Sequence, residues 1–311
     1  MTAKNHHYIP EFYLRGFVED EGSQILTIDL KDKKQFTTNP KNVGSRKYFN
    51  RVDIDGLDPD AVEKAMGEKF EGPASAALKR LIEGQLPHEK DEDYIFNVIA
   101  LLAARSPEKR ENWRRFNASI AEGLIGWNLS SKENYEASMS KDSSTTEKEI
   151  SYEDMKSFFE SNAYKIDMSV SSHLEMEIES IDTILPLLDF RSWHVISTNK
   201  ETGYFVTSDH PVVLTWADKD LVPPEFQSQI GFGLKNTIIY FPIAKTMAWV
   251  GVSYGSNIQY KGTREIVARV NSAVIKKTYR QVYAPSLNFY CLNAAGGIKT
   301  GHQLVTQIEN A

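Results

Sequence analysis

GYFVTSDHPVVLTW, residues 203–216, is rich in β-branched and aromatic residues and is interrupted by a turn signal at Asp209-His210-Pro211. This combination is typical of antiparallel strands joined by turns. Three neighbouring stretches share it: SWHVIST at 192–198, TIIYFPI at 237–243 and TMAWVGVSY at 246–254. We therefore expect a mainly antiparallel sheet in the C-terminal part of the chain.

The chain before residue 190 has the apolar spacing of helices. YIFNVIALLAAR at 94–105 is apolar nearly all round and predicts a buried helix. The spacing predicts further helices over about 58–82, with a break near Gly72-Pro73, and over about 106–127 and 151–188. Helices and strands thus come in blocks rather than in strict alternation. We predict an α+β fold, with a helical N-terminal half packed against a C-terminal mainly antiparallel sheet.

Length and composition limit the domain organisation. The chain has 311 residues, of which 41% are hydrophobic and 25% charged, as in an ordinary globular protein. We expect a single α+β domain over residues 1–311, with a helical subdomain at 58–190. The stretch 130–151 is the most polar of the chain and is predicted to be a mobile loop. Cys291 is the only cysteine, which excludes an intramolecular disulfide and a CxxC zinc site.

Charge and hydropathy narrow the class of protein. A net charge of −6 argues against a wholly basic nucleic-acid-binding surface but is compatible with a local basic groove. The sequence shows no apolar run of the signal-peptide type near its start and no run long enough to span a membrane. We expect a cytoplasmic protein without a membrane partner, and a homo-oligomer is compatible with the sequence.

The segment NHHYIPEFYLRGF, residues 5–17, carries an unusual density of chemically active side chains. Histidine can bind a metal or act as acid or base near neutrality, and arginine can hold a carboxylate or phosphate. If a helix began near Pro10, His7, Glu11 and Arg15 would share one face. The candidate residues are His6, His7, Tyr8, Tyr13 and Arg15. The alternative is that the aromatic residues pack in the core while the histidines make structural hydrogen bonds.

A second candidate segment is LAARSPEKR, residues 102–110. An arginine that ends an apolar helix is costly to bury without an anionic partner. Ser106-Pro107 then begins a new helix, whose free N–H groups favour an anion. Arg105 and Arg110 are therefore candidate substrate-binding residues. Alternatively, Arg105 complements the dipole of its own helix, and Arg110 is a solvated surface charge.

The third candidate segment is TSDHPVV, residues 207–213, where a strand ends in a turn. Asp209 and His210 could bind a metal, act as a general base or orient another group, and Ser208 lies next to them. The competing interpretation is a turn in which Asp209 accepts hydrogen bonds from nearby backbone N–H groups. Asn271 is a further candidate for ligand binding, with backbone hydrogen bonding as its alternative. Carboxylates are routine on a helix, so no special role is predicted for three residues: Glu63, Glu68 and Glu71.

The order of these three motifs resembles the bacterial domain of unknown function 4238 family. The motifs are NHHYIPEFYLRGF, an apolar helix ending in R-S-P-x-x-R, and a strand followed by T-S-D-H-P. The family's third motif has asparagine between aspartate and proline, where this chain has His210. The resemblance therefore gives Asp209 more catalytic weight than His210. It implies a motif order and no defined activity.

Two functions are consistent with these residues. In the first, His6, His7 and Asp209 converge with Arg15 and Arg105 on one pocket that hydrolyses a phosphodiester in RNA or DNA, as a nuclease-like toxin or phage-defence effector would. A divalent metal ion is then a candidate cofactor. In the second, the protein binds an anionic small molecule, a nucleotide or a protein partner without catalysis. The lack of a complete nuclease motif favours the second, but phosphodiester hydrolysis fits this set of side chains best, and we predict the hydrolase with the binding module as the alternative.

Overall fold

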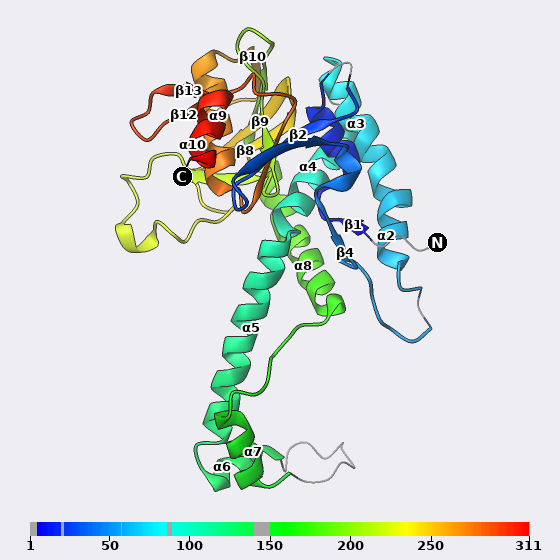
Figure 1. Ribbon diagram of the computed structural model, residues 1–311, viewed down its shortest axis with the longest axis vertical. Helices are drawn as coiled ribbons and strands as arrows, with labels where there is room; N and C mark the ends of the chain where they lie inside the picture. Colours follow the sequence, from blue (N-terminus) through cyan, green and yellow to red (C-terminus); the bar gives the residue numbers. More distant parts are fainter. Residues whose placement is uncertain (1–4, 20–21, 57, 86–88, 140–149, 311) are drawn as a thin grey trace. The chain divides into compact units, whose positions relative to one another are not determined.

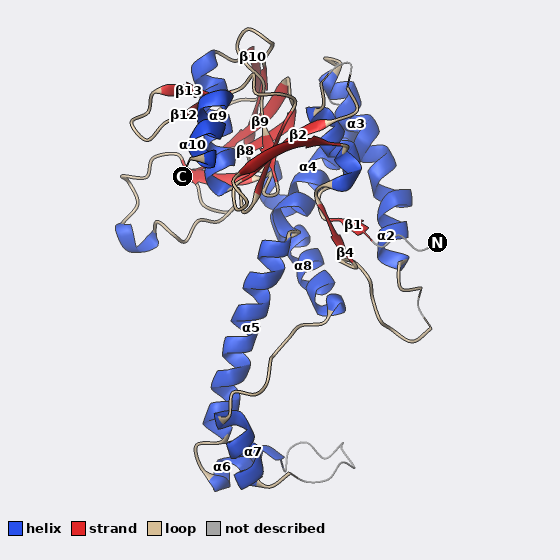
Figure 2. Ribbon diagram, viewed as in Figure 1, coloured by secondary structure: helices blue, strands red, loops and turns tan. Residues whose placement is uncertain are grey.

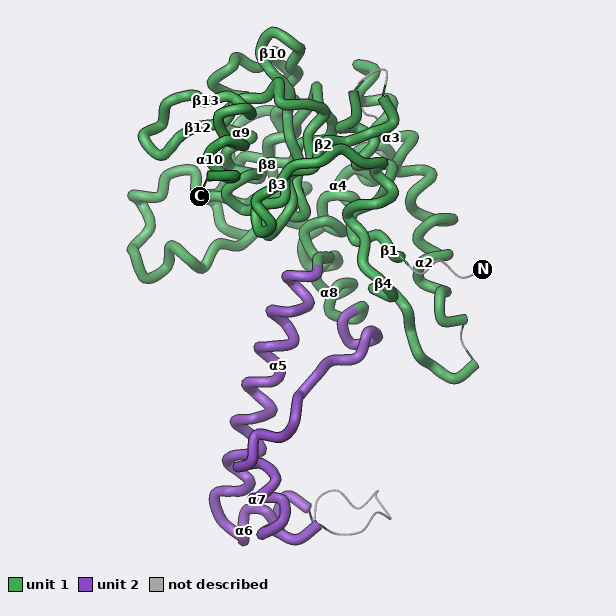
Figure 3. Tube along the Cα trace, in the orientation of Figure 1, with its two compact units in different colours: residues 1–106, 174–311 green, residues 107–173 purple. Residues whose placement is uncertain are grey.

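The computed structural model describes residues 5–19, 22–56, 58–85, 89–139 and 150–310. The α+β fold predicted from the sequence is confirmed: helices dominate the N-terminal half, and the sheets are mainly antiparallel (Figures 1 and 2). The chain divides into two compact units. Unit 1 comprises residues 1–106 and 174–311, and unit 2 comprises residues 107–173 (Figure 3).

A five-stranded sheet lies at the centre of unit 1. In spatial order its strands are β10 (Ile258–Lys261), β5 (Ser192–Ser197), β9 (Met247–Val252), β8 (Thr237–Ala244) and β7 (Val213–Trp216). Neighbouring strands are antiparallel, except that β10 runs parallel to β5. Three of the four strand-rich stretches seen in the sequence therefore lie in this sheet, and the fourth, residues 203–216, contributes β7 to it.

The side chains of β8 and β9 alternate between two hydrophobic cores. Ile239, Phe241 and Trp249 belong to the core on one face, whereas Tyr240 and Val250 belong to the core on the other. Successive side chains of a strand point to opposite faces, so the sheet separates the two cores. Both strands are buried on both faces, which explains their nearly continuous apolar sequences.

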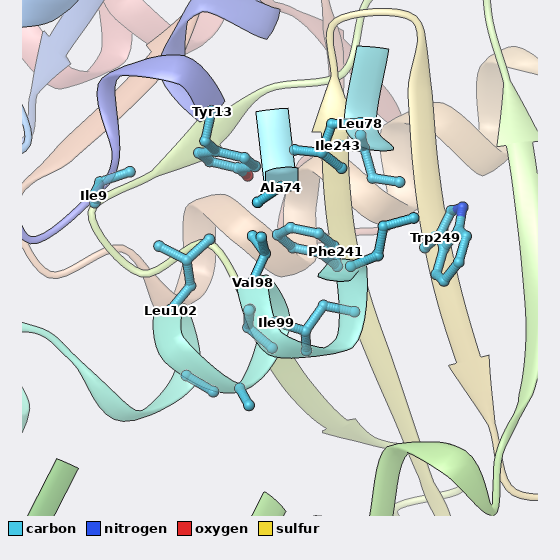
Figure 4. Packing of buried hydrophobic residues seen from close by; sticks show 14 of the residues in the cluster. Ile9, Tyr13, Ala74, Leu78, Val98, Ile99, Leu102, Phe241, Ile243 and Trp249 are labelled. Carbon is cyan, nitrogen blue, oxygen red and sulfur yellow. The ribbon is translucent and has the colours of Figure 1, made fainter. Parts of the chain in front are cut away.

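The first core lies between the sheet and the helices of the N-terminal half. These helices are α3 (Gly72–Ile82), α4 (Glu89–Ala104) and α8 (Val170–Asp189), whose residues 174–189 belong to unit 1. Figure 4 shows side chains of α3 and α4 gathered around Phe241, with Tyr13 from the opening segment beside Ala74. In the described ranges, neither α4 nor any other helix is long and apolar enough to cross a membrane.

The helix that contains Gly72-Pro73 is not broken there. α2 (Ala61–Met66) continues through a π-helical turn, η3 (Gly67–Glu71), directly into α3. Pro73 directly follows this π-helical turn and has no N–H group to donate to the preceding turn of the helix. The predicted break is therefore a local widening of one continuous helix, a feature often found at functional sites.

The second core lies between the other face of the central sheet and the C-terminal helices α9 (Arg264–Lys277) and α10 (Gly301–Glu309). A four-stranded antiparallel sheet contributes to it. Its strands, in spatial order, are β3 (Lys34–Thr38), β2 (Ile25–Asp29), β11 (Gln281–Ala284) and β6 (Thr207–Ser208). The hairpin of β2 and β3 thus pairs, through β2, with β11 from the C-terminal part of the chain.

Short elements complete unit 1. The strand β1 (Asn5–His7) pairs with β4 (Ser45–Lys47), and β12 (Tyr290–Leu292) pairs with β13 (Ile298–Thr300). The short helices are α1 (Glu11–Leu14), η1 (Arg15–Phe17), η2 (Pro40–Asn42) and η4 (Pro224–Phe226). The opening segment therefore begins as a strand and becomes helical only after Pro10, as proline at the start of a helix requires.

Unit 2 is helical. It contains α5 (Pro107–Asn128), α6 (Lys132–Met139) and α7 (Tyr152–Glu160). Arg114 and Arg115 donate to the Glu111 carboxylate and lower its pKa to about 2. This unit is shorter than the helical subdomain expected at 58–190, and the single-domain assignment stays a prediction. Of the polar stretch 130–151, residues 140–149 lie outside the described part of the chain.

Asn271, on α9, connects three segments of unit 1. Its fully buried side chain accepts a hydrogen bond from the Val206 N–H at 3.0 Å and donates to the carbonyls of Tyr204 and Tyr290, both at 2.9 Å. A primary amide is suited to this arrangement because it offers one acceptor and two donors at once. The side chain considered a ligand contact is therefore occupied by backbone groups.

We predict that Asn271→Leu destabilises the protein by roughly 2–4 kcal/mol, because three buried backbone groups would lose their partner. Urea unfolding measures this change. Lys277→Leu, at an exposed position of the same helix, serves as control and should change the free energy of unfolding by less than about 0.5 kcal/mol. Equal effects of the two substitutions would contradict the bracing role of Asn271.

Candidate functional site

The strand β1 determines where the two adjacent histidines point. It pairs with β4 so that His6 lies opposite Arg46 and His7 opposite Ser45, and the next N–H group, of Tyr8, donates to the Gly44 carbonyl at 2.9 Å. Neighbouring side chains of a strand face opposite sides. Accordingly, His6 is fully buried, whereas His7 is partly exposed. The two histidines thus occupy different environments.

His6 holds the loop that precedes α2. Its Nδ1 accepts a hydrogen bond from the Asn50 N–H at 3.0 Å, so in this arrangement the ring proton lies on Nε2. Nε2 is 3.6 Å from an oxygen of the buried Asp60 carboxylate. The side chain of Asn50 donates to the Glu63 carboxylate at 2.9 Å. His6 therefore positions Asn50, which in turn positions Glu63.

His7 lies in a group of charged side chains. Burial lowers the pKa of its imidazole below 6.5, although the nearby carboxylates of Glu11 and Glu63 and a hydrogen bond with the Lys41 backbone act in the opposite direction. Arg105 lowers it further. The Nε2 atom of His7 has no hydrogen-bond partner among the described residues. The ring is neutral at neutral pH and has a buried nitrogen whose hydrogen-bonding capacity is unused among the described residues.

Glu71, in the π-helical turn, belongs to the same group. Burial raises the pKa of its carboxyl above 4.5, and the negative charges of Glu63 and Glu11 raise it further, while Arg105 lowers it. Like charges close together disfavour ionisation of one of them. We call His7, Glu11, Glu63, Glu71 and Arg105 the acid–base cluster. It contains a carboxyl that retains its proton at higher pH than usual and an imidazole that loses its proton at lower pH than usual.

Arg105 and Arg15 approach this cluster in different ways. Arg105 follows the last residue of α4, is 4% exposed, and acts electrostatically on both His7 and Glu71. The Arg15 side chain is 54% exposed and binds the Glu11 carboxylate at 2.5 Å. The structure therefore brings the mid-chain arginine to the opening segment. It also brings together His7, Glu11 and Arg15, although only the residues after Pro10 are helical.

The tyrosines of the opening segment connect it to the sheets. Tyr13 is fully buried, and its hydroxyl is 2.7 Å from the Thr207 hydroxyl and donates to the Pro242 carbonyl at 2.7 Å. Tyr8 is buried next to Tyr283, and burial raises the pKa of both phenols well above the ordinary value. Both hydroxyls therefore stay protonated at physiological pH. These contacts fix the opening segment against the segment 207–209.

Asp209 stabilises a turn. Its carboxylate accepts hydrogen bonds from the backbone N–H groups of Tyr279, Arg280 and Gln281, at 2.9, 2.7 and 3.0 Å. These groups connect α9 to β11, so the side chain closes the end of the helix against the next strand. Ser208 likewise accepts from the His210 N–H at 3.0 Å. This arrangement matches the turn interpretation, and a catalytic role of Asp209 and His210 stays a prediction.

The remaining candidates lie elsewhere. The Asn271 side chain is occupied by backbone groups. Arg110 belongs to unit 2, where burial of His173 and then the positive charge of Arg110 lower the pKa of the His173 imidazole. In the part of the chain that is described, no three histidine, cysteine, aspartate or glutamate side chains are arranged to hold a metal ion. Within the acid–base cluster, Glu11, Glu63 and Arg105 thus shift the pKa values of His7 and Glu71 without forming a metal-ligand set among the described residues.

Sequence reasoning missed the helical carboxylates and Asn50. Glu63 and Glu71 were treated as routine surface charges, yet they lie on the face of one helix that meets the opening segment. A signal was present: Glu63 and Glu71 are eight positions apart, a spacing that returns to nearly the same face of a helix.

We predict that Asp209→Asn destabilises the protein by roughly 2–3 kcal/mol, because an amide retains only one acceptor oxygen for the three N–H groups that the buried carboxylate now accepts from. Chemical denaturation measures this change. Asp218→Asn is the matched control, since Asp218 accepts one hydrogen bond, from the Asp220 N–H, in an exposed turn. A stable Asp209→Asn protein that had lost ligand binding would contradict the structural role.

Comparison with known proteins gives a family and no function. The profile of the family described as protein of unknown function (DUF4238) matches residues 5–286, which include all three motifs, the acid–base cluster and both sheets. No curated protein and no solved structure matches the chain. The match covers most of the chain and agrees with the motif order seen in the sequence. The protein therefore belongs to the DUF4238 family.

Proposed function

We propose that the protein is a phosphodiester hydrolase of the nuclease type, which acts through the acid–base cluster. The observation that supports this proposal is the environment of His7 and Glu71. The two side chains have pKa values displaced toward each other, and a buried arginine acts on both. Groups whose surroundings move their pKa values toward the working pH are candidates for general acid and general base.

The roles follow from the protonation states. Neutral His7 accepts the proton of the attacking hydroxyl or water as the new P–O bond forms. Protonated Glu71 gives its proton to the leaving oxygen as the old P–O bond breaks. Arg105 stabilises the negative charge that develops on the phosphoryl oxygens. Glu63, held by Asn50, keeps the pKa of Glu71 high.

In this proposal, His6 and Asp209 act by position. His6 orders the loop that holds Asn50 and Glu63, and Asp209 fixes the segment against which the opening residues pack. The substrate is RNA or DNA, and the biological role is that of a bacterial toxin or phage-defence effector. The alternative, a module that binds an anionic ligand without catalysis, would use the same arginines and predicts binding without product.

We expect the protein to cleave labelled RNA or DNA of mixed sequence with a bell-shaped pH dependence of kcat/KM. His7 must be neutral, which requires a pH above its lowered pKa, and Glu71 must be protonated, which requires a pH below its raised pKa. The optimum should therefore be acidic, with one limb set by His7 and the other by Glu71. Gel analysis of cleavage products across the pH range measures this profile.

Substitutions test the assignment of roles. His7→Gln and Glu71→Gln should each lower kcat by about 10²-fold or more, because each removes a proton transfer from the transition state. Glu68→Gln is the matched control, since it removes one carboxylate from an exposed position of the same helix. If no nucleic acid is cleaved at any pH but a bound ligand is lost in His7→Gln, the binding module is the correct function.

We further predict that Glu71→Gln is more stable than the unchanged protein at pH 7. The folded-state pKa of Glu71 is raised above 4.5, so its stabilising contribution is present below pH 4.5 and is lost as the pH rises through that raised value. Because the carboxyl is partly exposed, we expect a gain of only about 1–3 °C in Tm.

The Tm difference should close as the pH falls below 4.5, where the carboxyl is protonated in both folded and unfolded chains. The lowered pKa of His7 has the opposite pH dependence. The stability contributed by His7 is present above pH 6.5 and is lost as the pH falls through the lowered pKa. Thermal melts of His7→Gln and Glu71→Gln across the pH range distinguish the stability contribution of His7 from that of Glu71. A loss of stability in Glu71→Gln at pH 7 would argue that the carboxylate is structural.

A further inference from the structure

A cavity of about 430 Å³ lies beside the opening segment. Its walls come from the segment around Arg15, from α3 and from the connection between β8 and β9. Its volume is in the range typical of small-molecule sites, about 300–1,000 Å³. None of the functions assigned so far uses it.

The cavity and the acid–base cluster share the same two chain segments. The opening segment contributes His7 and Glu11 to the cluster and then Arg15 to the cavity. The helix formed by α2, η3 and α3 contributes Glu71 to the cluster and then, one turn later, Ser75 to the cavity. The ion pair between Glu11 and Arg15 joins the two regions. The cavity and the acid–base cluster therefore lie next to each other, where the opening segment packs against this helix.

The lining combines apolar surface with charges of both signs. Phe12 and Ile82 contribute apolar surface, and Arg15 and Lys79 contribute positive charge. Lys79 is 3.9 Å from the Glu83 carboxylate, and its side chain is 77% exposed, so this pair binds weakly. An aromatic ring, cations and carboxylate acceptors together suit a nucleotide, which has a flat ring, an anionic phosphate and amino-group donors.

We propose that this cavity holds one unstacked nucleotide next to the bond that is cleaved, so that the substrate is single-stranded nucleic acid. This inference rests on the proposed function, since it places the nucleotide beside the acid–base cluster. A base that enters a cavity of this volume must leave the stack and its pairing partner. That step costs least in a single strand, so a duplex should bind more weakly.

The test fills the cavity. Ser75→Trp places a large ring in it, whereas Ala76→Trp, the matched control, adds the same ring at the next, exposed position, which does not line the cavity. Binding of fluorescein-labelled single-stranded RNA and DNA, and of their duplexes, is measured by fluorescence anisotropy on the full chain. Ser75→Trp should weaken single-strand binding about tenfold, and Ala76→Trp should leave it unchanged.

A second variant keeps the test decisive if Ser75→Trp does not fold. Lys79→Glu reverses an exposed charge at the cavity and should weaken binding several-fold at low salt, because it repels the phosphates. Lys69→Glu is its control, at an exposed position of the same helix that does not line the cavity. Circular dichroism establishes that the variants remain folded.

The outcomes separate this inference from the proposed function. Unchanged affinity and KM in folded Ser75→Trp and Lys79→Glu, or duplex binding as tight as single-strand binding, overturns the inference even if cleavage is observed. Single-strand binding that is lost in Ser75→Trp, without cleavage by the unchanged protein, supports the nucleotide site and overturns the hydrolase. Absence of binding to every nucleic acid overturns both.

Discussion

Burial of β8 and β9 on both faces is the constraint on which unit 1 depends. A strand whose alternate side chains all need apolar surroundings requires a separate hydrophobic layer on each side. Helices α3, α4 and α8 supply one layer, and α9, α10 and the four-stranded sheet supply the other. Each fully buried aromatic or aliphatic side chain contributes about 1.5–3 kcal/mol, so the two layers together stabilise the sheet from both sides.

The same constraint fixes the opening segment. Phe241, on the face of β8 that meets the helices, stacks on Tyr13 with ring centroids 5.5 Å apart, and the Tyr13 hydroxyl bonds to Thr207 and to the Pro242 carbonyl. Once Tyr13 is packed, the helical turn around it directs Glu11 and Arg15 outward, and the strand before it buries His6 and exposes His7. The chemistry of the opening residues is therefore a consequence of core packing.

The sequence predicted what depends on local pattern. Periodicity and composition act over a few residues, and they predict the hairpin of β2 and β3, the buried helix α4 and the strands after residue 190. It also placed Arg105 with the opening segment, through motif order. It did not reveal the roles of Glu63 and Glu71, because their pKa environment arises from residues distant in the chain. Asp209 was predicted both as a catalyst and as a turn residue, since the same carboxylate chemistry serves either; the deciding N–H groups lie some 70 positions away.

Some buried polar groups of unit 1 have their hydrogen bonds satisfied by the protein, whereas others are held in an unfavourable charge state. The first kind stabilises the fold, and the second kind is a candidate for function. Asn271 and Asp209 are buried, and each forms several hydrogen bonds with backbone groups that need a partner. Such groups stabilise the fold and require no further explanation. Glu71 is the opposite case, because burial and two neighbouring carboxylates make its ionised form unfavourable. A fold alone gains nothing from this arrangement, which a neutral amide of the same shape would avoid. Its cost is understandable if the carboxyl has to give up a proton above pH 4.5, because only a carboxyl held protonated above its ordinary range can do so.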